Sequence, residues 1–258
     1  MKRIFTLLIV LLPFVSCQKE TPAAAPEADT IFVTINNFAT KAQIGTDQVL
    51  KWSENDKVAV MGDSDYVASE FQYSSGAGYT TAAFKGYIPE GETFIVCHPS
   101  TAKCDGTTFR GVIDTKVTHK MPFQELGSLP LWGKTKDLTS VSLTSPCGIL
   151  KLNLKGTCVV KSIRLDAGKP VSGEFFCNLE NSLFAMVGGS NLILMEAGNT
   201  ELVVSEYTPF YFILPPGEYD TMQFNVTDTE GEVAYLTIDK NVTITPGKYT
   251  SLSFNINE

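Results

Sequence analysis

Residues 149–154 read ILKLNL, and this short stretch decides the fold class. Its three leucines fall on one side of an extended chain, whereas Lys151 and Asn153 fall on the other side. The same alternation returns in residues 222–227 (MQFNVT) and 252–256 (LSFNI). Strands with one buried face and one solvent-exposed face are typical of antiparallel sheets that are covered on one side. The pattern therefore predicts an all-β protein.

Turn-forming residues separate these runs along the chain. Proline and glycine stand together at residues 215–217 (PPG) and 246–247 (PG), where they favour tight turns. Strands at spacings of about 8–12 residues, with no amphipathic helix between them, are typical of β-sandwiches. Residues 122–140 interrupt this rhythm, and a fresh series of strands follows. We therefore predict two tandem antiparallel β-sandwich domains, at residues 30–140 and 141–258.

The N-terminus, residues 1–16, has the layout of a secretory signal. Two basic residues precede an apolar run at 4–15, which is too short to span a bilayer as a helix. Val15-Ser16-Cys17 resembles a bacterial lipobox. This resemblance implies that the signal peptide is cut before Cys17 and that Cys17 carries the lipid, because several acyl chains on one residue anchor a protein stably. The alternative is an ordinary signal peptide with an incidental cysteine.

Residues 17–29 are expected to form a lipidated tether. Gln18-Lys19-Glu20 resembles the signal that directs lipoproteins of Bacteroidetes to the outer face of the outer membrane. The following TPAAAPEAD cannot build a core, because it consists mainly of alanine, proline and acidic residues. We therefore expect a lipid-anchored protein of the outer membrane that is exposed at the cell surface.

The composition is that of a globular, acidic protein. Of the 258 residues, 43% are hydrophobic and 19% are charged, which argues against disorder as the main state. The formal net charge is −8, and an acidic chain repels the phosphates of nucleic acids. We therefore expect no nucleic-acid partner.

The cysteines leave the disulfide question open. An odd number of cysteines remains after the lipobox residue, so they cannot all pair within one chain. No CxxC spacing is present, which argues against a structural zinc site. The five are Cys97, Cys104, Cys147, Cys158 and Cys177.

The sequence predicts no enzyme, no metal site and no cofactor. The chain has two histidines, His98 and His119, and none of the common hydrolase or nucleotide-binding motifs. Cys97 precedes His98 directly, but adjacent residues of a strand point to opposite faces and cannot act as a nucleophile and its base. Asp63 and Asp65 resemble a fragment of a calcium loop, yet a solvated turn explains them better because too few oxygen ligands follow.

Trp132 is the candidate glycan contact. It lies in a stretch rich in proline and glycine, which predicts a loop, and an aromatic ring on a loop can stack on a sugar. Packing in the core or between domains is the alternative for this residue.

Two stretches together resemble a known family. The first is Ala39-Thr40-Lys41 followed by residues 50–60 (LKWSENDKVAV), and the second is 148–156 (GILKLNLKG). These stretches, in this order, resemble the fimbrillin-like surface lipoproteins of Bacteroidetes, which are related to type V pilins. The resemblance implies two transthyretin-like β-sandwich domains and a role in surface pili. It also implies assembly by strand exchange, in which a protease cuts after an early basic residue and a partner's strand replaces the first strand.

In this chain the cut would fall at Lys41 and release a strand that includes residues 31–35; the alternative is an ordinary loop lysine. The chain ends at Glu258, immediately after the strand expected over 249–256, which favours a tip or anchor subunit over a repeating stalk subunit. The leading hypothesis is thus a surface adhesin or a pilus tip or anchor subunit. Its partners would be other pilin subunits or ligands on host or bacterial surfaces. The alternative is a glycan-binding lipoprotein of a polysaccharide-uptake system.

Overall fold

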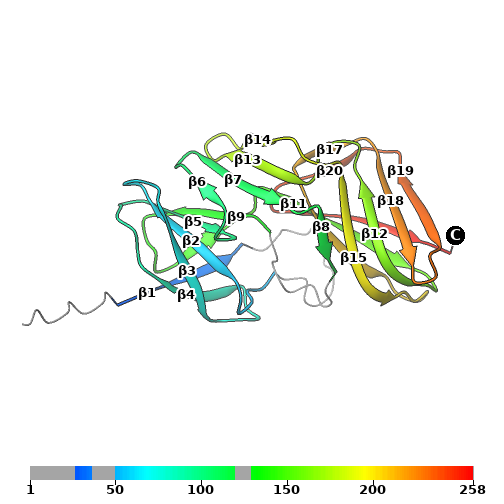
Figure 1. Cartoon of the computed structure of the whole chain (residues 1–258), viewed down its shortest axis with the longest axis horizontal. Helices are drawn as coiled ribbons and strands as arrows, with labels where there is room; N and C mark the ends of the chain where they lie inside the picture. The colour runs from blue at the N-terminus through cyan, green and yellow to red at the C-terminus, as the bar shows by residue number, and fades with distance from the viewer. Residues whose placement is uncertain (1–26, 37–49, 120–128, 258) are drawn as a thin grey trace, which may run out of the picture.

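The computed structural model describes residues 27–36, 50–119 and 129–257 (Figure 1). Within these ranges the chain forms strands, turns and irregular segments but no α-helix, and most neighbouring strands run antiparallel. The predicted all-β fold class is therefore confirmed. No helix in these ranges has the length and the apolar character needed to cross a lipid bilayer.

The first sheet has seven strands in the order β10-β1-β4-β3-β2-β5-β9. It curls until its two ends meet, where Trp132 in β9 and Thr144 beside β10 exchange backbone hydrogen bonds of 2.9 and 2.8 Å. One face of the sheet encloses a core that includes Trp52, Phe71 and Phe84. The strands are β1 (Asp29–Ile35), β2 (Lys57–Gly62), β3 (Ala68–Ser75), β4 (Thr81–Gly86), β5 (Phe94–His98), β9 (Leu131–Thr135) and β10 (Val141–Leu143).

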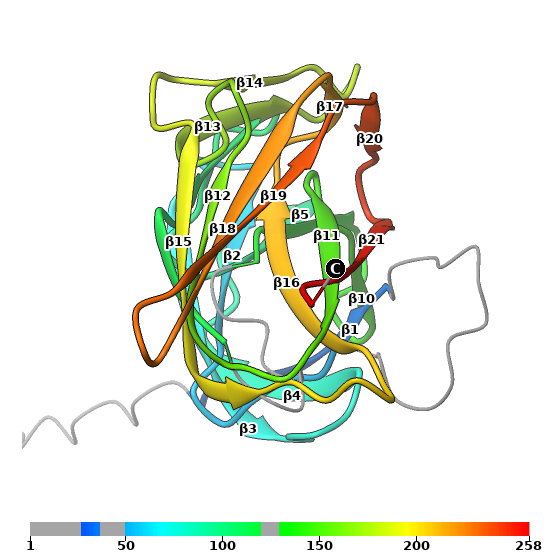
Figure 2. The same ribbon diagram turned by 90° about the vertical axis from the view of Figure 1, so that its right-hand side faces the viewer.

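Two further sheets pack face to face as a β-sandwich (Figure 2). One has the order β19-β18-β12-β15-β8 and the other the order β16-β11-β21. The leucines of residues 149–154 lie in β11, fully buried in the sandwich core, as their alternation predicts. The strands are β8 (Lys116–Thr118), β11 (Gly148–Lys155), β12 (Val159–Asp166), β15 (Leu192–Glu201), β16 (Thr208–Leu214), β18 (Met222–Asp228), β19 (Val233–Ile238) and β21 (Tyr249–Asn255).

A four-stranded sheet and a two-stranded ribbon complete the described structure. The sheet has the order β14-β13-β7-β6, and the ribbon pairs β17 with β20. These strands are β6 (Lys103–Cys104), β7 (Thr108–Ile113), β13 (Gly173–Asn178), β14 (Phe184–Met186), β17 (Gly217–Tyr219) and β20 (Val242–Ile244).

Strand pairing crosses the predicted boundary at residue 141 in both directions. β10 joins β1 of the first sheet, whereas β7 and β8 pair with β13 and β15. The larger hydrophobic core also contains Ala59, Met61, Ile95 and Cys97, which lie on the second face of the first sheet. The two halves of the sequence therefore share sheets and a core, and the division into domains at 140 and 141 stays a prediction.

Lys151 departs from the expected pattern. The alternation of apolar and polar residues in 149–154 predicts that Lys151 faces solvent, yet its side chain is only 4% exposed. The reason is that its face of β11 also carries Ile149, and Tyr211 lies beside it on β16; both residues are buried in the core of the first sheet. Burial lowers the pKa of the Lys151 ammonium group. The face of β11 that the sequence pattern predicts to be exposed to solvent is thus partly covered by the neighbouring sheet.

Candidate functional site

β1 lies in the interior of the first sheet rather than at a free edge. It pairs antiparallel with β4 and parallel with β10. Ile31, Val33 and Ile35 are at most 1% exposed, because alternate residues of the strand point into the core. The indole Nε1 of Trp52 donates a 3.0 Å hydrogen bond to the backbone oxygen of Val33. We call this place between β4 and β10 the β1 seat.

The β1 seat is held by two kinds of noncovalent contact. Backbone hydrogen bonds along both edges give affinity, and the buried alternate side chains give register, which is how an added strand is recognised. Phe32 points away from the core and is 49% exposed, so the outer side of β1 contributes less. Loss of β1 would leave the facing edges of β4 and β10 unpaired.

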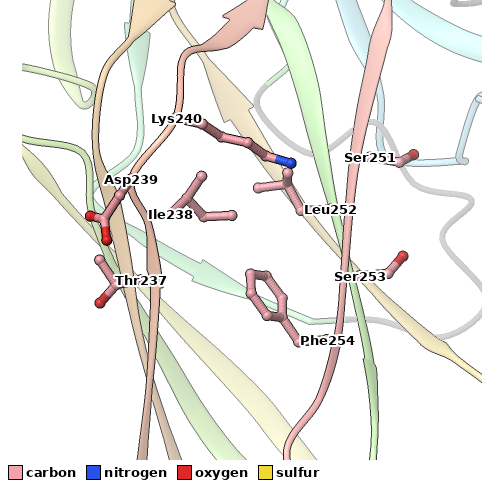
Figure 3. A pocket seen from close by; sticks show the side chains of 8 residues that line it. All are labelled: Thr237, Ile238, Asp239, Lys240, Ser251, Leu252, Ser253 and Phe254. Atoms are coloured by element: carbon pink, nitrogen blue, oxygen red, sulfur yellow. The ribbon is translucent and has the colours of Figure 1, made fainter.

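A groove of about 420 Å³ opens at the far end of the sandwich, between the end of β19 and β21 (Figure 3). Each of these strands is the last of its sheet, so each has one unpaired backbone edge in the described part of the chain. Ile238, Lys240, Leu252 and Phe254 point into the groove, and Leu252 and Phe254 are half-buried. We call it the edge groove; its geometry offers apolar contacts and the backbone groups of two strand edges.

Cys97 and His98 lie on opposite faces of β5, as predicted. Cys97 belongs to the larger core, and burial raises the pKa of its thiol well above the ordinary value. The His98 ring packs edge-on against Trp52 at 5.4 Å in the other core. Its Nδ1 lies 3.0 Å from the backbone oxygen of Leu129, and its Nε2 lies 3.6 Å from Asp56 Oδ1. The pair therefore has no shared reaction site, and His98 ties the loop before β2 to the sheet.

The five cysteines within the described residues are unpaired thiols in this structure. Burial raises the pKa of each thiol, which keeps the group protonated and a poor nucleophile near neutral pH. His119 is also buried, where it packs on Phe210 at 4.5 Å, and burial lowers its pKa to about 4. The five thiols and His119 therefore lie in surroundings typical of side chains that pack the protein interior.

Asp63 and Asp65 act as turn caps. Asp63 Oδ1 accepts a 2.8 Å hydrogen bond from the backbone N–H of Glu92, and Asp65 Oδ1 accepts one of 2.9 Å from Val67. Backbone hydrogen bonds, the one from Glu92 first, lower the pKa of the Asp63 carboxyl. In the described ranges no three His, Cys, Asp or Glu side chains gather where they could hold a metal ion.

Trp132 lies in strand β9, not in a loop as its proline- and glycine-rich surroundings predict. It pairs with Cys97 on one side and Thr144 on the other, and its half-buried ring packs against the larger core. Its contact with a glycan stays a prediction. Two other predicted sites, the lipidated Cys17 and the processing site Lys41, lie outside the described residues.

Comparison with known proteins finds solved structures of similar fold but no matching family model or curated protein. No protein-family model matches the chain, and no curated protein matches it significantly. A crystal structure described as a "putative cell adhesion protein" from Bacteroides ovatus ATCC 8483 superposes with a TM-score of 0.57 at 14% identity, over 90% of this chain and 92% of that one. The chain therefore shares its fold with this protein.

A second structure with the same description, from Bacteroides uniformis ATCC 8492, superposes with a TM-score of 0.52 at 12% identity, over 88% of this chain and 93% of that one. Both matches run over nearly the whole of each chain. At these identities the matches establish a shared fold, and this fold agrees with the predicted resemblance.

Proposed function

We propose that this chain is an adhesion and assembly protein of the bacterial cell surface that joins a partner subunit by exchange of β1. The observation that carries the proposal is the place of β1. It is the first described strand, it is inserted between β4 and β10, and it buries three alternate side chains completely. The similarity in fold to the Bacteroides adhesion proteins supports the same class of function.

Lys41 would be the switch for this exchange. It stands in the connection between β1 and β2, so a cut at Lys41 would leave β1 attached by noncovalent contacts alone. An incoming strand with alternating apolar residues could then replace β1 and restore the same hydrogen bonds. The subunit would act at the tip or the anchor of a pilus, or as an adhesin that stands alone.

Cys17 would attach the protein to the outer membrane through its lipid. Replacement by serine, Cys17→Ser, should move the protein from the membrane fraction to the soluble fraction. N-terminal sequencing of the protein from cells separates the two processing steps: a blocked terminus indicates the acylated cysteine, and a terminus at Ala42 indicates a cut at Lys41. Retention of the Cys17→Ser variant in the membrane would contradict lipid anchoring at this residue.

Strand exchange is tested directly with a variant that carries a unique protease site in place of residues 39–43. After the cut, a labelled peptide of residues 27–36 should enter the protein, and it should not enter the uncut protein. The matched control is the same peptide with Val33→Asp, because a carboxylate cannot enter a fully buried site without a large desolvation cost. Equal uptake of both peptides, or no uptake after the cut at any temperature below unfolding, would refute exchange at the β1 seat.

A further inference from the structure

The outer face of the β19-β18-β12-β15-β8 sheet presents an ordered set of polar side chains to solvent; this sheet is the front layer at the right of Figure 1. Its inner face supplies the sandwich core, so the side chains of the outer face are those that the alternation leaves outside. We call this surface the polar face. Strand register aligns its residues in cross-strand rows, and the middle row is Tyr235, Asn225, Arg164, Leu194 and Lys116.

Arg164 stands at the centre of the polar face. It is exposed and forms no ion pair or side-chain hydrogen bond with any residue that the structure describes. Beside it, the buried Oδ1 of Asn225 also has no hydrogen-bond partner among the described residues. A guanidinium prefers a planar, doubly accepting anion such as a carboxylate.

A hollow of about 380 Å³ lies at one end of the polar face, next to the middle row. Asp166, Gln223 and Thr237 form an adjacent cross-strand row at this hollow, and Thr221 joins them from the loop before β18. Asp166 Oδ1 is already engaged, because it accepts hydrogen bonds from the backbone N–H of Gly168 at 3.1 Å and from another side chain. The side chains of Gln223 and Thr237 have no such protein partner within the described ranges and can bind hydroxyl groups.

Tyr235 stands beside this hollow on β19. It is 66% exposed, although an aromatic ring of this size is more often covered. Register places it two strands from Arg164, which is about 10 Å across the sheet. An apolar ring surface, an unpaired guanidinium and neutral hydrogen-bonding groups therefore face the same side within reach of one small oligomer.

We propose that the polar face binds a carboxylate-bearing oligosaccharide. Arg164 receives the carboxylate, Tyr235 stacks on the apolar side of a sugar ring, and Gln223 and Thr237 bind hydroxyl groups in the hollow. A peptide is the poorer fit, because strand addition could occur only at the free edge of β19, whereas the backbone groups of β18, β12 and β15 are already paired on both sides. The site does not involve β1, so it stands independently of strand exchange.

The test is calorimetric titration of the purified protein with trigalacturonate, with maltotriose as the uncharged probe. We expect trigalacturonate to bind and maltotriose to bind at least about tenfold more weakly, because it lacks the charged contact with the guanidinium. Arg164→Gln and Tyr235→Ala should each weaken trigalacturonate binding by about tenfold, since the first removes the charge-assisted hydrogen bonds to the carboxylate and the second removes the aromatic face. The matched controls are Lys161→Gln, an exposed cation of the same strand outside the row, and Val233→Ala on the same strand as Tyr235; neither should change binding.

Three outcomes would overturn the proposal. The first is no binding of trigalacturonate, and the second is equal binding by the Arg164→Gln and Lys161→Gln variants. The third is binding of a triaspartate peptide as tightly as trigalacturonate, which would assign the face to acidic peptides. Each variant is checked for an unchanged unfolding midpoint, because these side chains lie on the surface and contribute little to stability.

Discussion

The strongest test of the fold compares two neighbouring residues of β1. Ile31 is 1% exposed and points into the core of the first sheet, whereas Phe32 is 49% exposed on the other side of the same strand. Ile31→Ala removes three carbon groups from a packed site, which costs about 2.4 kcal/mol in transfer free energy, and the cavity raises the total to about 3 kcal/mol. Phe32→Ala removes a larger side chain, yet half of it is already in water, so we expect a loss of about 1 kcal/mol.

Urea unfolding followed by tryptophan fluorescence measures both free energies of unfolding. The emission of Trp52 is a suitable probe, because its indole is buried and donates a hydrogen bond to Val33 in β1. We expect Ile31→Ala to be the more destabilising variant, because only Ile31 is fully buried. If Phe32→Ala proves as destabilising as Ile31→Ala, the assigned inner and outer sides of β1 are wrong. The description of the β1 seat would then be refuted as well.

Three further predictions concern other parts of the molecule. The pKa of His119 is about 4 in the folded protein and near 6.5 in the unfolded protein, so the unfolded state binds more protons between these two pH values. The free energy of unfolding should therefore fall as the pH drops from about 6.5 to 4. His119→Phe should reduce this pH dependence in unfolding curves taken across the range. Gly133→Ala should cost more than about 2 kcal/mol in urea unfolding, since an added Cβ would lie 2.3 Å from the backbone oxygen of Ser142 where the first sheet closes; a neutral effect would contradict that closure. The thiols of Cys97 and Cys147 are fully buried, so a thiol reagent should label them only after denaturation, and rapid labelling of the native protein would show that they are accessible.

Local sequence determined the class of structure, as strand β11 of the sandwich shows. The leucines of residues 149–154 alternate along one strand, and that strand buries them in the sandwich core. Alternation is a property of the extended backbone, so it can be read without a partner. The opposite faces of Cys97 and His98 followed from the same rule and are confirmed.

Tertiary structure decided which faces are covered and which residues meet. Lys151 is buried and Trp132 lies in a strand, because each environment depends on sheets that come from distant parts of the chain. The row that places Tyr235 beside Asn225 and Arg164 likewise exists only through strand register. The sequence by itself determined an all-β chain, because the two-residue period is local. The neighbours of each strand are set by pairing across long separations, and for that reason the β1 seat, the edge groove and the polar face could be found only in the folded protein.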